Sequence, residues 1–598
     1  MSGERSGHIR EINGPILRIH LPGGRNGEQV RIGGLDIVGE IIALEGDDAI
    51  VQAYESTEGL RPGETVEGLD HPLTVELGPG LLQGIFDGVQ RPLNEIADLA
   101  GDNIPRGLHI HALDRSREWP FVPADGLEPG ATMQPGQRLG TVQETDTIEH
   151  RILLPPGIGG ALIDLVPAGD YRLDKTIARV RDAHGNVHKL KLFHRWPVRL
   201  PRPYTRRDHG VEPLITGQRV LDTFFPLLKG GKGAVPGPFG AGKTMVQQQV
   251  ARWSNADIVI FVGCGERGNE LVEVLESFPK LQDPHTGRGM MERTLLVANT
   301  SNMPVVAREA SIYVGMTMAE YFRDQGYDVV MLADSTSRWA EALREVAGRL
   351  GQMPVEEGYP AYLGSRLAAA YERAGRVETL NGERGSVTLI GAVSPPGGDF
   401  SEPVTSHTKE IIGTFWALSK ELADARHYPS VDWVDSFSQD VAVAAGWWAE
   451  NINGAWSARR TEALSLLARD AELSRIVNLV GPEALSSAQR WELEGASLVK
   501  EAVLQQSALD DADAYCSPRK QFELLDLVMQ VFERGSELIS LGAPVQELAE
   551  HPVMARIRRA KSTWRSDETD QLAKFAGEVY DALAALRSEY AASQETAP

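Results

Sequence analysis

Short apolar runs separated by polar turns dominate the first 70 residues. Residues 16–21, 35–44 and 49–54 are rich in aliphatic side chains, and the polar turn 45–48 separates the last two runs. Strands of this length joined by glycine-rich turns are typical of a small β-barrel, which we predict over residues 1–70. No candidate ligand chemistry occurs there, so we interpret the barrel as structural.

Beyond the barrel the pattern stays strand-like but becomes richer in turns. We interpret residues 71–110 as a connector into a central domain. Between residues 111 and 190, strand-like pieces such as 171–173 and 187–192 alternate with glycine and proline. This pattern predicts a β-rich insertion, for which a protein-contact surface is our default interpretation.

From residue 191 to residue 440, short apolar runs alternate with longer helical stretches. One such stretch, 305–323, follows Pro304, which suits the first position of a helix. The alternation predicts a mostly parallel sheet covered on both faces, with ligands beyond the carboxyl ends of its strands. The candidate strands are 258–262, 295–298, 329–333 and 387–390.

After residue 440 the apolar positions recur at helical spacing. Two stripes, within 524–532 and 572–586, are interpreted as packing surfaces of helices. The chain is therefore predicted to be a multi-domain α/β protein. Its predicted parts are 1–70, 71–110, 111–190, 191–440 and 441–598.

The clearest chemical signal is the run GPFGAGKT at 237–244, which fits G-x-x-x-x-G-K-[ST] without a gap. An apolar run precedes it and a helical pattern follows it, as a phosphate-binding loop requires. Glycines let backbone N–H groups close on phosphate oxygens, and the helix adds its positive dipole end. Lys243 would reach the β and γ phosphates, and the Thr244 hydroxyl would hold Mg²⁺. The nucleotide-binding residues predicted by this motif are Gly237, Pro238, Phe239, Gly240, Ala241, Gly242, Lys243 and Thr244.

A candidate catalytic carboxylate follows the predicted strand 258–262. Glu266 would lie at the carboxyl end of that strand, where it can accept a hydrogen bond from water and direct the water at the γ-phosphorus. Arg267 can pair with a phosphate oxygen or with a neighbouring acid. The alternative is that Glu266 only caps a helix that begins near Asn269. Cys264 has no histidine near it in sequence and is interpreted as a small buried residue.

A second apolar strand, 329–333, ends in Asp334. This is the Walker B arrangement, in which the carboxylate reaches the hydration shell of the Mg²⁺ that Thr244 holds. Arg338, which follows closely, could contact phosphate or a neighbouring subunit, and pairing on the surface is the alternative.

Further along, Tyr428 offers an aromatic face suited to stacking on a base, with packing in the core as the alternative.

The bulk composition limits the function classes. The chain has 598 residues and a formal net charge of −23, which argues against binding of bulk nucleic acid. It has two cysteines, far apart in sequence, so we expect a reducing compartment and no disulfide framework. We find no apolar signal core at the N-terminus and no apolar run of 18 residues. Any membrane role is therefore expected to depend on partners.

Five runs are specific in combination: GPFGAGKT (237–244), GERGNE (265–270), ADSTSR (333–338), SPPGGDFSEPVT (394–405) and LQQSALDDADAYC (504–516). Together they resemble the catalytic A subunit of V-type and archaeal or bacterial A-type rotary ATPases. Two N-terminal stretches, 75–93 and 150–159, match as well, so the resemblance covers essentially the whole chain. It implies a recA-like P-loop core, and the insertion is similar to the bulge domain of these catalytic subunits.

The resemblance also implies roles for individual residues. Lys243 and Thr244 would bind phosphate and Mg²⁺ of ATP or ADP, Glu266 would polarise the attacking water, Arg267 would order the site, and Asp334 would be the Walker B acid. Two aromatic residues, Tyr428 and Tyr515, would form the adenine pocket. The family often places another aromatic side chain between them, where this sequence has Leu509. Ala241 stands where eukaryotic relatives carry cysteine, so thiol control at that position is not expected.

The partners implied by the resemblance are those of a rotary motor. A non-catalytic B-type subunit would alternate with this chain in an A3B3 ring and supply an arginine finger in trans. Central and peripheral stalk subunits would connect the ring to a membrane rotor that carries H⁺ or Na⁺. The chain would then be cytoplasmic and peripheral on the membrane, with no nucleic-acid partner.

Two other functions are compatible with a recA-like core. A hexameric RNA translocase is disfavoured by the acidic balance and by the absence of an obvious RNA-binding motif before the core. A non-catalytic nucleotide-binding ring subunit is disfavoured by the joint presence of Lys243, Glu266 and Asp334. The coupling ion and the physiological direction of the reaction are not determined by this sequence.

Overall fold

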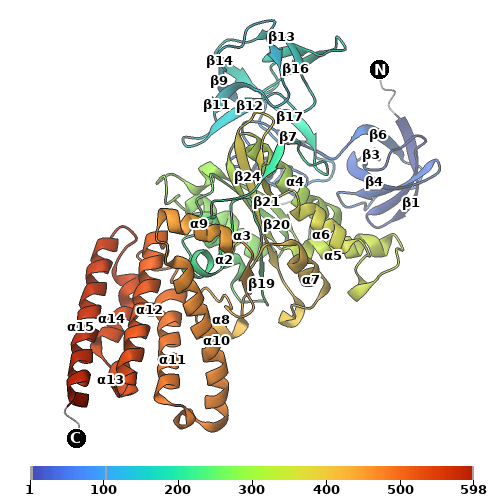
Figure 1. The fold of residues 1–598 in the computed structure, drawn as a ribbon. Helices are drawn as coiled ribbons and strands as arrows, with labels where there is room; N and C mark the ends of the chain where they lie inside the picture. The colour runs from blue at the N-terminus through green and yellow to red at the C-terminus, as the bar shows by residue number, and fades with distance from the viewer. Residues whose placement is uncertain (1–4, 102–103, 596–598) are drawn as a thin grey trace. The chain divides into compact units, whose positions relative to one another are not determined.

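The computed structural model describes residues 5–101 and 104–595 (Figure 1). The contacts along the chain divide it into two compact units. The first unit comprises Met1–His209, Gly230–Lys232 and Ala256–Ile412. The second comprises Gly210–Lys229, Gly233–Asn255 and Gly413–Pro598. Residues of the stretch 191–440 thus occur in both units, because the chain passes between them several times.

The first unit begins with a closed barrel of six strands in the order β1-β2-β5-β4-β3-β6. Aliphatic side chains fill its interior, and Leu17, Val30, Ile41 and Val51 are fully buried there. The alternation of apolar and polar residues along each strand places one set inside and the other in solvent. The strands are β1 (Arg5–Asn13), β2 (Ile16–His20), β3 (Glu28–Ile32), β4 (Ile37–Glu45), β5 (Asp48–Ala53) and β6 (Thr65–Pro72).

The predicted insertion consists of two antiparallel four-stranded sheets, with the orders β10-β13-β15-β16 and β12-β11-β9-β14. Trp119, Phe121, Leu162 and Val180 are among its buried side chains. These strands are β9 (Glu118–Pro123), β10 (Thr132–Met133), β11 (Arg138–Gln143), β12 (Glu149–Leu153), β13 (Gly160–Leu165), β14 (Gly169–Arg172), β15 (Ala178–Arg181) and β16 (Val187–Leu190). The flanking connector contains β7 (Thr74–Leu77), β8 (Ile85–Phe86) and α1 (Leu93–Ala100), and β7 pairs with β17 (His194–Pro197).

A parallel sheet with the order β24-β22-β20-β21-β8 forms the core of the first unit. Its strands β20 (Ile258–Glu266), β21 (Thr294–Thr300), β22 (Asp328–Asp334) and β24 (Arg384–Val393) contain the four predicted runs. Apolar residues occupy both faces of β20 and β22, as expected for strands covered by helices. Antiparallel β23 (Gly375–Glu378) pairs with β24, and β18 (Arg206–Asp208) pairs with β23.

Helices cover this sheet, and α4 (Val305–Asp324) packs against several of its strands. Nearly every residue of α4 is buried, including charged ones, because α5 (Thr336–Arg349) packs on it as well. The remaining helical segments of this unit are α3 (Gly268–Ser277), η2 (Phe278–Lys280), η3 (Met290–Arg293), η4 (Glu356–Gly358), α6 (Leu363–Tyr371), η5 (Pro396–Gly398) and α7 (Pro403–Ile411).

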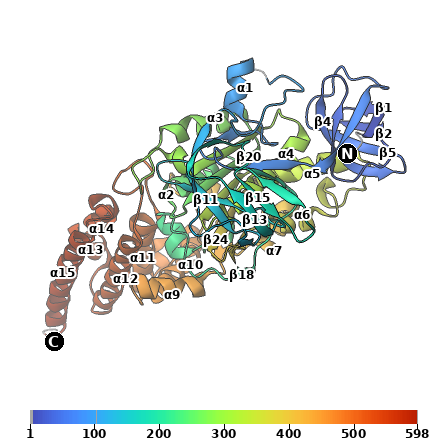
Figure 2. The ribbon, with the colours of Figure 1, turned by 90° about the horizontal axis from the view of Figure 1, so that it is seen from above.

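The second unit joins three short strands to a helical domain. Strand β19 (Lys232–Pro236) pairs in parallel with β25 (Thr414–Phe415), which pairs antiparallel with β26 (Phe437–Ser438). The helices α10 to α15 follow one another along the chain, and α11, α12 and α15 pack on neighbouring helices of the group (Figure 2). Trp448 and Trp456 stack with ring centroids 5.2 Å apart in a buried cluster that also contains Phe522. The helical segments are η1 (Val220–Phe224), α2 (Lys243–Trp253), α8 (Lys420–Asp424), α9 (Val441–Asn451), α10 (Trp456–Val480), η6 (Pro482–Ala484), α11 (Ser487–Leu498), η7 (Val499–Leu504), α12 (Pro518–Ser540), α13 (Val545–Ala549), α14 (Pro552–Thr563) and α15 (Thr569–Glu595).

Within the part of the chain that the structure describes, the helices are all too short or too polar to cross a lipid bilayer.

Candidate active site

The glycine loop lies between β19 and α2 in the second unit, as its strand–loop–helix pattern predicts. Gly240 and Gly242 have φ angles of +79° and +91°, which side chains with a Cβ rarely adopt. A Cβ at Gly237 would approach the side chain of Leu418 to 2.7 Å. The Nζ of Lys243 donates to the carbonyl oxygens of Gly237 and Pro238 at 2.8 and 3.1 Å. The loop therefore curls around the lysine amine and requires glycine where it turns.

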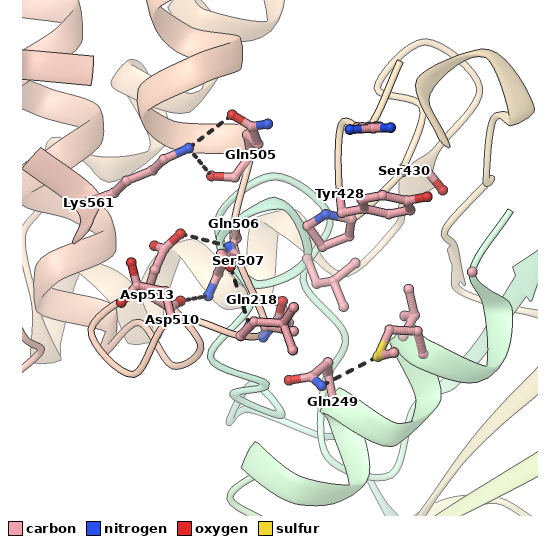
Figure 3. A pocket seen from close by; sticks show the side chains of 18 of the residues that line it. Gln218, Gln249, Tyr428, Ser430, Gln505, Gln506, Ser507, Asp510, Asp513 and Lys561 are labelled. Carbon is pink, nitrogen blue, oxygen red and sulfur yellow. Dashed lines mark hydrogen bonds between the residues drawn. The ribbon is translucent and has the colours of Figure 1, made fainter. Parts of the chain in front are cut away.

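A cavity of about 630 Å³ opens beside this loop, entirely within the second unit (Figure 3). One side is formed by Gly240 to Gly242 and the first turns of α2, and the opposite side by the loop 505–510. Tyr428 lies between them and is 46% exposed. The volume suits a nucleoside-sized group. The accessible surface of the lining is mostly apolar, although many of the residues that contribute to it are polar or charged.

Tyr428 is held by its neighbours rather than packed in the core. Its carbonyl oxygen accepts a hydrogen bond from the backbone N–H of Gln506 at 2.8 Å. Two residues further on, the Ser430 hydroxyl donates to the carbonyl oxygen of Ala241 at 2.5 Å. These two bonds connect the aromatic residue to both walls of the cavity, so its ring faces a site adjoining the phosphate loop.

The other two residues predicted at the base pocket differ in position. Tyr515 lies outside the cavity lining: its ring stacks on Trp253, with centroids 5.2 Å apart, and covers Gly217. Leu509 does line the cavity and is 96% exposed. Tyr428 and Leu509 therefore line the cavity, whereas Tyr515 does not.

The candidate carboxylates lie in the first unit, at the carboxyl ends of adjacent parallel strands. Gly263 of β20 is in register with Asp334 of β22, so Glu266 and Asp334 end at the same edge of the sheet. Burial, the charge of Asp334 and the hydrogen bond and charge of Glu270 raise the pKa of Glu266 to about 8. Asp334 itself is only 3% exposed. This edge therefore concentrates acidic groups that repel one another.

The alternatives left open by the sequence are resolved in part. Helix α3 begins at Gly268, with Arg267 at the N-cap position, and the Arg267 side chain makes no capping hydrogen bond. Arg338 pairs with Glu341 one turn along α5, at 2.9 Å, which is the surface pairing considered above. Cys264 is fully buried, and burial raises the pKa of its thiol to about 12, as expected for an inert core cysteine.

The donor set fits a hard divalent cation. Mg²⁺ prefers carboxylate, hydroxyl and water oxygens and is often held by one or two protein groups together with substrate phosphates. Asp334 of the first unit and Thr244 of the second unit each carry oxygens of this kind. The pKa of Glu266 is raised by burial and by the neighbouring acids Asp334 and Glu270, and a cation near these acids would reduce their repulsion. Among the described residues no cluster of three or more histidine, cysteine or acidic side chains forms a complete metal cage. The roles of Lys243, Thr244, Glu266, Arg267 and Asp334 stay predictions.

Sequence reasoning missed part of the cavity. Met245 and Gln249 of α2 contribute to it, as does Arg426, and Lys561 reaches it from α14. Gln249 and Met245 are one helical turn apart just after the phosphate loop, so their spacing in the sequence indicates that they lie on the same face of the helix. Lys561 gives no such signal, since a lysine on a helix is usually a solvated residue.

Comparison with known proteins places the chain in a class. Models of the ATP synthase alpha/beta family match its nucleotide-binding domain (217–438), its beta-barrel domain (9–70) and its barrel-sandwich domain (110–199). The model of the C-terminal domain of V and A type ATP synthase matches 445–547. The fold is also similar to that of EscN, the assembled ATPase of the enteropathogenic E. coli type III secretion system. The TM-score is 0.62 at 21% identity, over 87% of this chain and 99% of EscN.

Relatives that match nearly the full length of this chain define its protein family more closely. The V-type ATP synthase alpha chain of Nitrosococcus oceani is 66% identical over 98% of this chain and 99% of its own length. The A subunit of the A-type ATP synthase of Methanopyrus kandleri is 53% identical over 94% of this chain and 95% of its own. The chain belongs to the family of V-type ATP synthase alpha chains and A-type ATP synthase A subunits. The predicted family and the predicted fold class are thereby confirmed.

Proposed function

We propose that this chain is the catalytic nucleotide-binding subunit of a rotary V/A-type ATPase, which interconverts ATP with ADP and phosphate. The observation that carries the proposal is an intact phosphate loop beside a nucleoside-sized cavity, in a chain whose relatives are named as chains of ATP synthases. Lys243 and Thr244 would bind phosphate, and Tyr428 would stack on the base.

The carboxylates of the first unit would serve the chemical step. Glu266 would accept a hydrogen bond from the attacking water, with Arg267 ordering the surrounding groups, because phosphoryl transfer depends mainly on positioning and on neutralising charge. Asp334 and Thr244 would hold Mg²⁺, which when bound neutralises charge on the phosphates. Its charge would also favour the ionised form of Glu266 that water activation requires.

The partners proposed are those of a rotary complex. A B-type subunit would alternate with this chain and supply an arginine in trans, and stalk subunits would connect the ring to a membrane rotor carrying H⁺ or Na⁺. The chain would then lie at the cytoplasmic face of the membrane, attached through these partners. An arginine supplied in trans is worth roughly 10³–10⁵ in turnover in related phosphoryl-transfer enzymes, so the isolated chain should be a poor ATPase.

Reconstitution tests this proposal. The purified chain is mixed with the B-type subunit encoded in the same genome, and phosphate release from Mg-ATP is measured for each protein alone and for the mixture. We expect activity to rise at least about a hundredfold in the mixture. Full activity of the isolated chain, or no activity in an assembled ring, would contradict the proposal.

A further inference from the structure

Lys561 connects the helical domain to the wall of the cavity. It lies on α14, and its Nζ donates to the Glu501 carbonyl oxygen at 2.6 Å. It also donates to the carbonyl oxygen and the side-chain oxygen of Gln505, at 2.9 and 3.2 Å (Figure 3). All three N–H groups of the ammonium can thus be used. Its own carbonyl oxygen accepts from the Nζ of Lys520 at 2.7 Å, which fixes the turn of α14 that carries it.

The carbonyl groups that Lys561 contacts belong to the end of a helical segment. The segment η7 ends at Leu504, and Gln505 follows it in an extended conformation. The last carbonyls of a helix lack partners within the helix, and a cation there satisfies them and interacts favourably with the dipole. Arg219 donates to the carbonyl oxygens of Val503 and Gln505 at the same helix end. Lys561 and Arg219 therefore together hold the end of η7, and Lys561 adds the contact that comes from α14.

The position of that loop determines the position of Tyr428. Directly after Gln505, the backbone N–H of Gln506 donates to the Tyr428 carbonyl oxygen at 2.8 Å. The Gln506 amide donates to the carbonyl oxygens of Gly217 and Asp513, both at 2.8 Å. A displacement of Gln505 would therefore be passed to the aromatic residue through a single peptide unit. The phosphate loop, on the other side of the cavity, is linked to these contacts two residues beyond Tyr428, where the Ser430 hydroxyl donates to the Ala241 carbonyl oxygen.

We propose that Lys561 is a positioning residue for the base-binding wall of the nucleotide cavity, holding the loop 505–510 and Tyr428 against the nucleoside part of the ligand. The inference rests on the proposed function, since it assumes that the cavity takes a nucleotide. It assigns a role in ligand affinity to α14, which lies outside all four matched domains.

The charges around Lys561 make its contacts with the two carbonyl groups sensitive to pH. Burial and the charge of Arg219 lower the pKa of Lys561 to about 8, while Asp513 and Glu501 oppose the shift. Above that pH the amine loses its charge and one of its three donors, so its hold on the two carbonyls weakens. The charged and titratable groups that face it are Glu501, Asp513, Arg219, Lys520 and His427.

Calorimetric titration of the full chain tests the inference with two probes, Mg-ATP and Mg-tripolyphosphate, of which only the first contains a base. Lys561→Met removes the charge and the donors, Lys561→Arg restores them, and Lys574→Met is the control at an exposed lysine of α15. We expect Lys561→Met to weaken ATP binding about tenfold, or about 1.4 kcal/mol, with tripolyphosphate affinity changed less than about twofold. Lys561→Arg and Lys574→Met should stay within about threefold of wild type for both probes.

Three results would overturn the inference: unchanged ATP binding in Lys561→Met, equal loss of both probes, or failure of Lys561→Arg to restore binding. Retained tripolyphosphate binding shows that the variant is folded.

A pH series adds a second measurement, because a lysine with a purely structural role would not make ATP affinity depend on pH. Between about pH 7 and 9, wild-type ATP affinity relative to tripolyphosphate should fall about threefold, whereas Lys561→Arg should stay flat. If the wild type binds neither probe, the proposed function fails, and the inference fails with it.

Discussion

At the scale of single residues, the proposed catalytic acid is a carboxyl group with a raised pKa. Glu266 sits at the end of β20 beside Asp334, and without a cation its pKa is raised to about 8. Replacing Glu266 with Gln keeps the shape and removes the charge that would polarise water. We expect the reconstituted ring to lose at least about a hundredfold in turnover, while Mg-ATP affinity changes by less than about threefold.

The measurement is steady-state phosphate release together with equilibrium nucleotide binding. Glu273→Gln, on the exposed side of α3, is the matched control and should leave both unchanged. Turnover retained in Glu266→Gln would remove Glu266 from the water-activating role and leave the binding site intact.

The same carboxyl should affect stability in a pH-dependent way. A carboxyl whose pKa is raised on folding contributes stability while it is protonated, and that contribution is lost as pH rises toward the folded value, here about 8. Without nucleotide and with a chelator present, Glu266→Gln should therefore be more stable than wild type at about pH 8.5, by on the order of 1–3 kcal/mol. The difference should shrink steadily toward about pH 5. Thermal unfolding across this range checks it, and a difference independent of pH would contradict the assignment.

At the scale of elements, a buried ion pair holds η1 to the loop that forms the cavity wall. The Arg219 guanidinium donates to Asp513 at 2.6 Å and to the carbonyl oxygens of Val503 and Gln505, all in the interior of the second unit. Asp513→Ala would leave the buried guanidinium without its counter-charge, which typically costs about 3–5 kcal/mol. We expect the unfolding midpoint of this unit to drop by several degrees, whereas Asp511→Ala, at an exposed neighbour, should leave it unchanged. An unaltered midpoint in Asp513→Ala would show that the pair is not what fixes the loop.

Some elements of the fold were predictable from the sequence pattern, and others were not. The strands β20 and β22 were predictable because parallel core strands are continuous apolar runs, and α4 because it follows a proline. The two-residue strands β25 and β26 were not, since so few residues carry no period. The phosphate loop was predictable from the spacing of its motif together with the apolar run before it and the helical pattern after it. Lys561 was not, because its partners are backbone carbonyls about 60 residues away, which no side-chain pattern records.

At the scale of the whole molecule, the parts proposed for catalysis are distributed over two units. The phosphate loop, the cavity and Tyr428 belong to the second unit, and Glu266 and Asp334 belong to the first. The segments that carry them come from several separate stretches of the chain, so an element-by-element prediction over residues 191–440 could not reveal the division.

This distribution makes a prediction about which segments respond to which ligand. If both units serve one nucleotide, ADP with a chelator should slow amide hydrogen exchange mainly in 237–246, 426–430 and 505–513, where the base and the phosphate loop are proposed to act. A non-hydrolysable ATP analogue with Mg²⁺ should add protection in 263–270 and 332–338, because only then are a γ-phosphate and a cation present for the acids of β20 and β22. Exchange of the assembled ring, followed by mass spectrometry, measures both sets, with the barrel strands β1 to β6 as the internal control. Protection of the first set alone under both conditions would mean that the carboxylates of the first unit do not act on the nucleotide held by the second.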